Sequence, residues 1–175
     1  MSGKTTMFRF QNLLRSPPQI GESSLGFTIL ELMIVVMIMG VLSSIALPSL
    51  IRQVGKARES EANQVLSSIA FAQQGYFFEN REFSDNYVDL GVGISPANYD
   101  FPDPETIPGT FRTKSQAISR DNGLTGSRDY AIGVYYDNNA HTYIIVLCQA
   151  ANVGIATQVP DSSAGTCTNG GVRIY

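Results

Sequence analysis

The chain has 175 residues, 12 of them basic and 15 acidic, and a formal net charge of −3. This length accommodates one long helix and one small globular part, but not two independent domains. Charged residues account for 15% of the chain, below the roughly 25% usual in soluble proteins, because a long apolar segment dilutes them. The acidic balance gives no reason to expect general binding to nucleic acid.

Residues 1–25 are polar and carry three basic residues, Lys4, Arg9 and Arg15, against one acid. The rest of the chain therefore holds 9 of the 12 basic residues and 14 of the 15 acidic ones. A basic segment before a membrane span and an acidic bulk after it predict that residues 1–25 lie on the cytoplasmic side and the bulk outside. A disordered basic tail would explain the three cations equally well.

From Leu32 to Ile51 the sequence has twenty residues without a charge, rich in Leu, Met, Ile and Val. As a helix this segment would cross roughly 30 Å of hydrocarbon. One carboxylate, that of Glu31, directly precedes it. A secretory signal peptide loses its apolar region on cleavage. Here the expected cut precedes the apolar segment, which therefore stays with the mature protein.

The segment 26–31, GFTILE, resembles the prepilin motif of type IV pilins and pseudopilins. The resemblance implies that a membrane peptidase cleaves between Gly26 and Phe27 and methylates the new amino group of Phe27. It also implies that Glu31, the acid at the fifth mature position, functions in assembly. The close match extends to about Tyr76, and the stretches KARESEAN and AQQGYFFEN look most like pilins of cyanobacteria.

One helix of about fifty residues is expected from Phe27 onward. Gly40 and Pro48 fall where pilin helices often carry a glycine and a proline. Pro48 cannot donate a hydrogen bond to the preceding turn and crowds it. Membrane helices tolerate proline, so we predict a kink at Pro48, with local melting during assembly as the alternative.

The helix becomes amphipathic after Arg52 and is expected to stop near Asn80. An apolar stripe outside the membrane must be covered, and the remaining chain is the expected cover. The predicted stripe consists of Ile51, Val54, Ala62, Val65, Ile69, Ala72 and Tyr76.

Residues 81–127 are rich in Pro, Gly, Asp and Ser and are expected to form a long connecting loop with short pieces of structure. Strand patterns at Tyr130–Tyr136 and Thr142–Cys148 flank a turn-forming DNNA sequence and predict a hairpin. Further strands are expected at Gly154–Val159 and Val172–Tyr175.

The predicted fold class is α+β: a long N-terminal α-helical spine packed against a small C-terminal antiparallel β-sheet, the pilin fold. Three or four antiparallel strands need cover on one face, and the amphipathic half of the helix can provide it. The expected organisation is a leader at 1–26, a transmembrane and assembly segment at 27–51, and a globular head at 52–175 that includes the amphipathic half of the helix.

The two cysteines, Cys148 and Cys167, both lie late in the part of the chain expected outside the membrane. In an oxidising compartment such a pair indicates a disulfide. It would close a ring of about twenty residues, worth roughly 3 kcal/mol in the chain-entropy model. Two unpaired buried thiols are the alternative. Pilins that resemble this chain often close a C-terminal loop in the same way.

No catalytic constellation stands out, and we expect no enzymatic activity, no cofactor and no metal. His141 is the only histidine and has no cysteine near it in sequence. Cys148 and Cys167, without histidine partners, make a poor zinc site. The acidic stretch Asp100–Glu105 lacks the glycine and the spacing of a calcium loop, so a solvated turn is expected there.

Glu31 is the residue whose chemistry needs an explanation, because a carboxylate at bilayer depth is unfavourable. Cleavage would free a cationic amine on Phe27, and a charge-assisted pair with Glu31 of another subunit would offset the desolvation. Pairing within one chain is an alternative. So is a purely local role, in which the negative charge suits the N-terminal end of the helix dipole.

The resemblance implies a structural subunit of a type IV pilus that polymerises with copies of itself. Its other partners would be the prepilin peptidase and methylase, the inner-membrane assembly machinery and, before assembly, the membrane. The chain would span the inner membrane with a periplasmic head and then enter a cell-surface filament for adhesion, twitching motility or DNA uptake. Nucleic acid would be contacted only through an assembled pilus. The alternatives are a minor pilin, a pseudopilin of type II secretion, or an uncleaved bitopic membrane protein with a periplasmic ligand-binding head.

Overall fold

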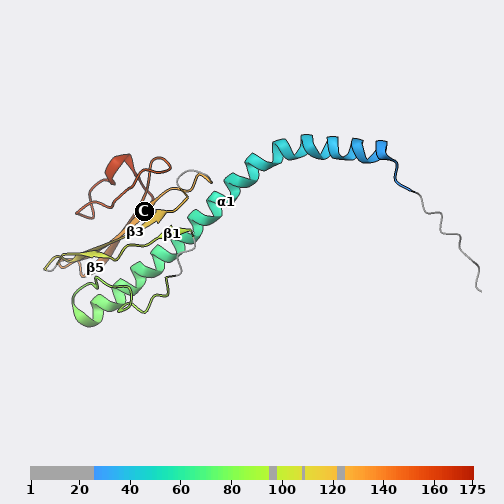
Figure 1. Cartoon of the computed structure of the whole chain (residues 1–175). Coiled ribbons are helices and arrows are strands. Elements are labelled where there is room, and N and C mark those ends of the chain that lie inside the picture. The colour runs from blue at the N-terminus through green and yellow to red at the C-terminus, as the bar shows by residue number, and fades with distance from the viewer. Residues whose placement is uncertain (1–25, 95–97, 108, 122–124) are drawn as a thin grey trace, which may run out of the picture. The chain divides into compact units, whose positions relative to one another are not determined.

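The computed structural model describes residues 26–94, 98–107, 109–121 and 125–175, so the predicted leader at 1–25 lies outside the described residues. The described residues divide into two compact units, with the boundary between Val41 and Leu42. One long helix and a small antiparallel sheet confirm the α+β class (Figure 1). The elements in chain order are α1 (Ile29–Asn80), β1 (Tyr99–Asp100), β2 (Glu105–Thr106), β3 (Arg112–Ser119), β4 (Tyr130–Asp137), β5 (Thr142–Gln149), the 3-10 helix η1 (Thr168–Gly170) and β6 (Val172–Arg173).

Helix α1 is 52 residues long and ends at Asn80, where the sequence predicts its stop. Arg81 then adopts a left-handed conformation with φ of 62°, and its N–H donates to the carbonyl of Phe77 at 2.9 Å. The Asn80 side chain donates to the carbonyl of Tyr76 at 3.1 Å. These two bonds satisfy carbonyls of the last turn, which have no partner within the helix.

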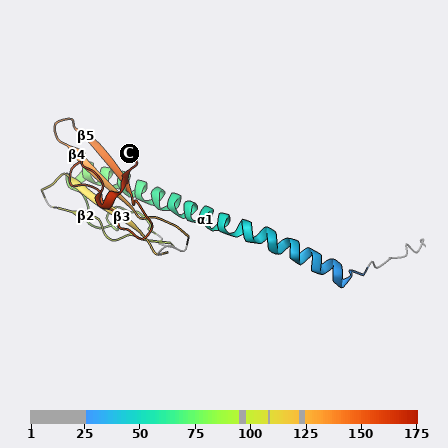
Figure 2. The ribbon, with the colours of Figure 1, turned by 90° about the horizontal axis from the view of Figure 1, so that it is seen from above.

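The strands pair antiparallel in the order β1-β3-β4-β5-β6, and β2 pairs with β3. Figure 2 shows β2, β3, β4 and β5 gathered beside the C-terminal part of α1. Strands β4 and β5 form the predicted hairpin, which closes at the pair Asp137 and Thr142. The Asp137 carboxylate accepts from the N–H groups of Asn139 at 2.8 Å and Ala140 at 3.2 Å. Such side-chain bonds to the following backbone are the reason why Asp favours turns. The predicted C-terminal strand is also present, as β6.

The prediction of a strand at Gly154–Val159 is wrong. This segment forms no ladder with the sheet. The N–H of Gln158 donates to the hydroxyl of Thr168 at 2.8 Å, and the N–H of Thr168 donates to the carbonyl of Gln158 at 3.1 Å. These bonds satisfy the backbone polar groups of Gln158 inside a loop, where backbone groups must otherwise find water or a sheet neighbour.

The prediction of a connecting loop over residues 81–127 is wrong for the eight residues of β3, which lies inside the sheet between β1 and β4. The core-facing residues Thr113, Ser115 and Ala117 are small or polar, and Lys114 lies on the other face. The sequence therefore lacks the alternation of apolar and polar residues that marks a half-buried strand.

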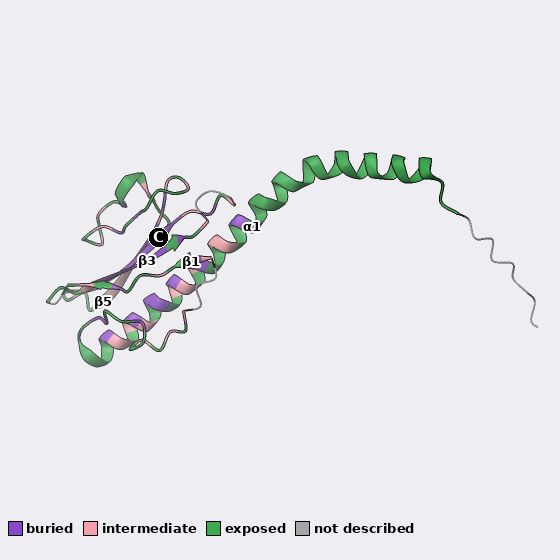
Figure 3. Cartoon of the chain, viewed as in Figure 1, coloured by how far each residue is buried: buried purple, intermediate pink, exposed green. Residues whose placement is uncertain are grey.

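The C-terminal part of α1 covers one face of the sheet, and the buried side of the helix faces the strands (Figure 3). The core joins this side to Ile132, Val134 and Leu147 of the hairpin. The predicted apolar stripe is confirmed at Ala62 and Ile69, which are buried, and at Val65, which packs against the core. The prediction missed Leu66 and Phe77, which are fully buried. The helix residues buried in the head are Gly55, Ala62, Leu66, Ile69, Ala70, Gln73 and Phe77.

Two members of the predicted stripe, Ile51 and Val54, are exposed. Gly55 is the first buried residue of the helix, so the cover provided by the head begins only there. At the other end Phe77 centres an aromatic cluster, with ring centroids 4.6 Å from Phe83 and 4.7 Å from Tyr136. Tilted aromatic pairs at such distances interact favourably through the quadrupoles of their rings, and this interaction adds to the stabilisation from burial.

Candidate functional site

A helix cap at the start of α1 involves Glu31, the residue expected to function in assembly. The hydroxyl of Thr28 accepts a hydrogen bond from the N–H of Glu31 at 3.2 Å, and the N–H of Leu32 donates to the Thr28 carbonyl at 3.2 Å. Thr28 followed three residues later by Glu31 is the spacing of a capping box. The carboxylate of Glu31 therefore lies in the first turn of the helix, where a negative charge interacts favourably with the helix dipole.

The N-terminal half of α1 presents its apolar side chains to the surroundings. Every large apolar residue from Phe27 to Val54 is exposed, and helix α1 is long and apolar enough to cross a membrane. Pro48 lies inside α1, which continues beyond it. A surface of this kind is stable only in lipid or against other apolar surfaces, because its exposure to water is unfavourable.

The first turns of α1 inside the head are held by a loop that follows β3. The Arg58 guanidinium pairs with Asp121, and Glu59 accepts from the backbone N–H of Arg128 at 3.0 Å. A side chain at Gly55 would overlap the carbonyl oxygen of Thr125. Glycine is therefore required where this loop approaches the helix closely.

The sheet face opposite α1 is covered by the loop between the cysteines. Cys148 on β5 and Cys167 form a disulfide, and both are buried. Their cluster includes Ala131, Tyr135, Val146 and Val159. The loop that the disulfide closes thus provides the second hydrophobic layer of the head, which a single helix on the other face cannot supply.

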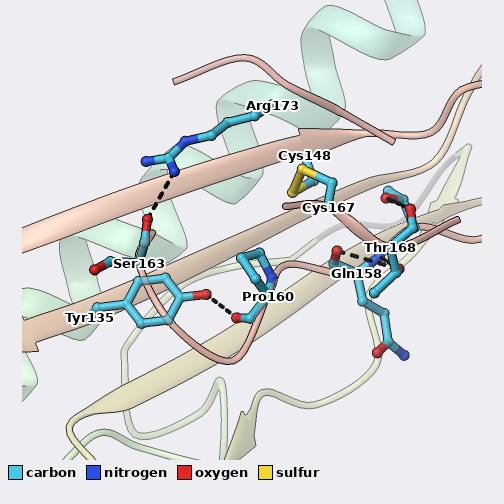
Figure 4. Close-up of a disulfide and its surroundings, with 9 residues drawn as sticks. Tyr135, Cys148, Gln158, Pro160, Ser163, Cys167, Thr168 and Arg173 are labelled. Atoms are coloured by element: carbon cyan, nitrogen blue, oxygen red, sulfur yellow. Dashed lines mark hydrogen bonds between the residues drawn. A yellow bond between two sulfur atoms is a disulfide. The ribbon is translucent and has the colours of Figure 1, made fainter. Parts of the chain in front are cut away.

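Hydrogen bonds, shown in Figure 4, hold this loop in place, and ion pairs attach it to the sheet. The Tyr135 hydroxyl donates to the carbonyl of Pro160, and its ring lies over Gly133, where a Cβ would be 2.8 Å from the ring. Lys114 Nζ lies 2.6 Å and Arg112 Nη1 3.0 Å from Asp161 Oδ1. The loop therefore has a defined position on the sheet beyond what the disulfide alone imposes.

Burial and ion pairing shift the pKa values of several groups in the head. The Lys114 side chain lowers the pKa of Asp161, and burial raises the pKa of Tyr135 to about 12. Burial also raises the pKa of Asp129, whose carboxylate accepts from the N–H of Ser119 at 2.8 Å. Tyr135 and Asp161 line one surface pocket together with Arg112, whereas Asp129 is not part of it.

Within the described residues no group of three or more His, Cys, Asp or Glu side chains could hold a metal ion. His141 lies in the β4–β5 turn, exposed, with Nδ1 3.2 Å from the hydroxyl of Tyr136. Asp100, in the acidic stretch, pairs with Arg120, which lowers the pKa of that carboxyl.

The family described as type IV pilin-like G and H matches residues 59–169, more than half of the chain. The chain belongs to this pilin-like family. The match confirms the family that the sequence indicates. The matched residues run from the first turns of α1 inside the head to η1, so they include the whole disulfide loop of this pilin-like protein.

Curated relatives of the pilin-like chain include two pilins and one secretion protein. The type IV major pilin protein PilA of Myxococcus xanthus is 41% identical over 73 residues, 42% of this chain and 33% of that protein. The type IV wide pilus major component PilA4 of Thermus thermophilus is 29% identical over 79 residues, 43% and 60% of the two chains. The type II secretion system core protein G of Pectobacterium carotovorum subsp. carotovorum is 30% identical over 90 residues, 51% and 57%.

The aligned part of the pilin-like chain spans between 33% and 60% of the length of these three relatives. Sequence reasoning missed Thr28 and the loop contacts of Arg58 and Glu59. The Thr28-x-x-Glu31 spacing was available as a signal for the cap. The partners of Arg58 and Glu59 lie 63 and 69 residues away in the chain, and no local pattern marks them.

Proposed function

We propose that this pilin-like protein is a structural subunit of a type IV pilus, polymerised through its N-terminal helix. The observation that carries the proposal is the apolar half of α1, whose large side chains the head leaves exposed. Burying about twenty such residues against other subunits, at roughly 25 cal/mol per Å², would favour assembly by tens of kcal/mol before opposing terms are counted. Family membership and relatives named as major pilins support the same reading.

The proposal includes processing and location. A prepilin peptidase would cleave between Gly26 and Phe27 and methylate Phe27, and the inner-membrane machinery would extract the subunit from the bilayer. Before assembly the chain would cross the inner membrane with its head in the periplasm. Pro48 would provide a kink in the helix. The disulfide loop would lie on the filament surface and influence adhesion.

Glu31 would pair with the amine of Phe27 on a neighbouring subunit. A hydrogen bond to a charged group is worth about 1.5–3 kcal/mol, and 1.4 kcal/mol is a factor of ten. Glu31→Gln should therefore lower the yield of sheared surface filaments by about tenfold or more. Wild-type yield from Glu31→Gln would contradict the assembly role.

Thr28→Ala is the matched control for Glu31→Gln. It removes the hydroxyl that accepts from the N–H of Glu31 but keeps the carboxylate. If both variants reduce assembly equally, the role of Glu31 is to support the helix end. Edman or mass analysis of the product tests the processing steps, since a mature N-terminus at methylated Phe27 excludes an uncleaved bitopic membrane protein.

A second candidate is a pseudopilus subunit, favoured by the similarity to a type II secretion core protein G. The two assignments differ in what deletion of the gene abolishes. A pilus subunit is recovered in bulk from sheared surface filaments, whereas loss of a pseudopilus subunit stops secretion of folded proteins and leaves surface filaments intact.

A further inference from the structure

The charges on the part of α1 that belongs to the head divide into paired and unpaired groups. Arg58 and Glu59 form ion pairs with the loop after β3. The four other charged residues in this part of the helix are exposed and form no ion pair with the described residues of the chain: Arg52, Lys56, Glu61 and Glu79.

These four residues lie on opposite flanks of the helix according to sign. Successive residues of an α-helix are rotated by about 100°. Measured from the buried side, the two basic residues point about 50–90° around the helix and the two acidic ones about 230°. A basic flank (Arg52 and Lys56) and an acidic flank (Glu61 and Glu79) therefore run along the two sides of the face turned away from the sheet.

The face between the flanks is uncharged and partly apolar. Phe71 and Phe78 point about 130–150° from the buried side, and they are 67% and 75% exposed. No other charged residue interrupts this face from Leu42 to Asn80. An uncharged strip with exposed aromatic side chains, bordered by charges of opposite sign, resembles the pattern that sets the partner and orientation of neighbouring helices in coiled coils.

We infer that this face packs against α1 of a second copy of the chain, in parallel orientation, with the basic flank of one copy on the acidic flank of the next. Two parallel copies bring opposite flanks together, whereas antiparallel copies bring like charges together. Arg52 and Lys56, one turn apart, repel each other within the chain. A carboxylate from the neighbour relieves this repulsion. The inference rests on the proposed function and assigns the contact that aligns the subunits.

The positions of the charges along the helix axis would make this contact repeat from one copy to the next. Glu61 lies about 8 Å and Glu79 about 35 Å further along the helix axis than Lys56. Copies at equal height cannot match the two flanks, so neighbours must be staggered by about one of these distances. A staggered contact between two different surfaces does not close on itself and generates an open helical filament.

Charge reversal and its compensation test the contact in cells that express the full chain. Lys56→Glu should lower the yield of sheared filaments by about tenfold, which corresponds to about 1.4 kcal/mol. Combining it with Glu61→Lys or with Glu79→Lys should restore the yield. Rescue by Glu61→Lys supports the shorter stagger and rescue by Glu79→Lys the longer one. Asp89→Lys, at an exposed acid outside the helix, makes a charge change of the same size and should leave the yield unaltered.

Failure of rescue by both compensating variants, or wild-type yield from Lys56→Glu, overturns the inference. Loss of the protein from the membrane fraction in Lys56→Glu, without rescue, would also overturn it and assign the basic flank to lipid headgroups. A non-reducing gel that reports the Cys148–Cys167 disulfide shows that each variant has folded. Absence of filaments from wild-type cells would overturn the proposed function and this contact with it.

A carbodiimide offers a direct measurement on sheared wild-type filaments, because it joins only an amine and a carboxylate already in contact. Covalent multimers should appear, with an isopeptide between Lys56 and either Glu61 or Glu79 of different chains. Since both partners are exposed, this cross-linking should weaken in 1 M salt, where the screening length falls to about 3 Å. Multimers that lack Lys56 in every cross-link would contradict the contact.

Discussion

The disulfide can be separated from the contacts that hold the same loop. Cys148 and Cys167 are 19 residues apart, and in the chain-entropy model closing such a loop destabilises the unfolded chain by about 3 kcal/mol. The folded loop keeps its other links, among them the Tyr135 hydroxyl on Pro160 and Lys114 on Asp161. Removing the bond should therefore lower the free energy of unfolding without releasing the loop in the folded state.

Two measurements on the full chain in detergent test this reasoning. Urea unfolding of the double variant Cys148→Ala and Cys167→Ala should show a loss of about 3–4 kcal/mol, including a packing term for the missing buried sulfurs. Chemically reduced wild type keeps both sulfurs and should lose only about 3 kcal/mol. Amide exchange at Thr168 should stay slow in both samples. A loss below about 1 kcal/mol, or rapid exchange at Thr168 in a still folded sheet, would refute the entropic account.

Five further substitutions have expected outcomes in the same unfolding assay. Gly55→Ala should destabilise the head by about 1–3 kcal/mol through overlap with a loop carbonyl, whereas Gly75→Ala, with nothing within 4 Å, should stabilise it by about 0.5–1 kcal/mol. Phe77→Ala, at a side chain 2% exposed, should lose about 3–5 kcal/mol, whereas Phe78→Ala should change stability by less than about 0.5 kcal/mol. Because burial raises the pKa of Asp129, wild-type stability should fall as the pH rises from about 4 through the folded-state pKa, and Asp129→Asn should remove that step.

Much of the fold could be predicted because its signals are local. A short stretch of sequence is enough to recognise the twenty uncharged residues in a row, the periodic helix and the hairpin with its Asp-Asn turn. The position of β3 does not, because Thr113 and Ser115 face the core while Lys114 is neutralised by Asp161, 47 residues away. A strand whose polar side chains find distant partners carries no apolar alternation to recognise.

The same distinction governs the candidate site. The motif at 26–31 and the cysteine pair stand out because their chemistry depends on residue type and spacing alone. The charges of α1 could not be sorted from the sequence, since Lys56 and Arg58 are both basic residues on an amphipathic helix. Only the folded head distinguishes them: Arg58 finds Asp121, while Lys56 extends from the exposed side. What remains after the head has satisfied its own charges is the set available to a neighbouring copy, and that remainder is basic on one flank and acidic on the other.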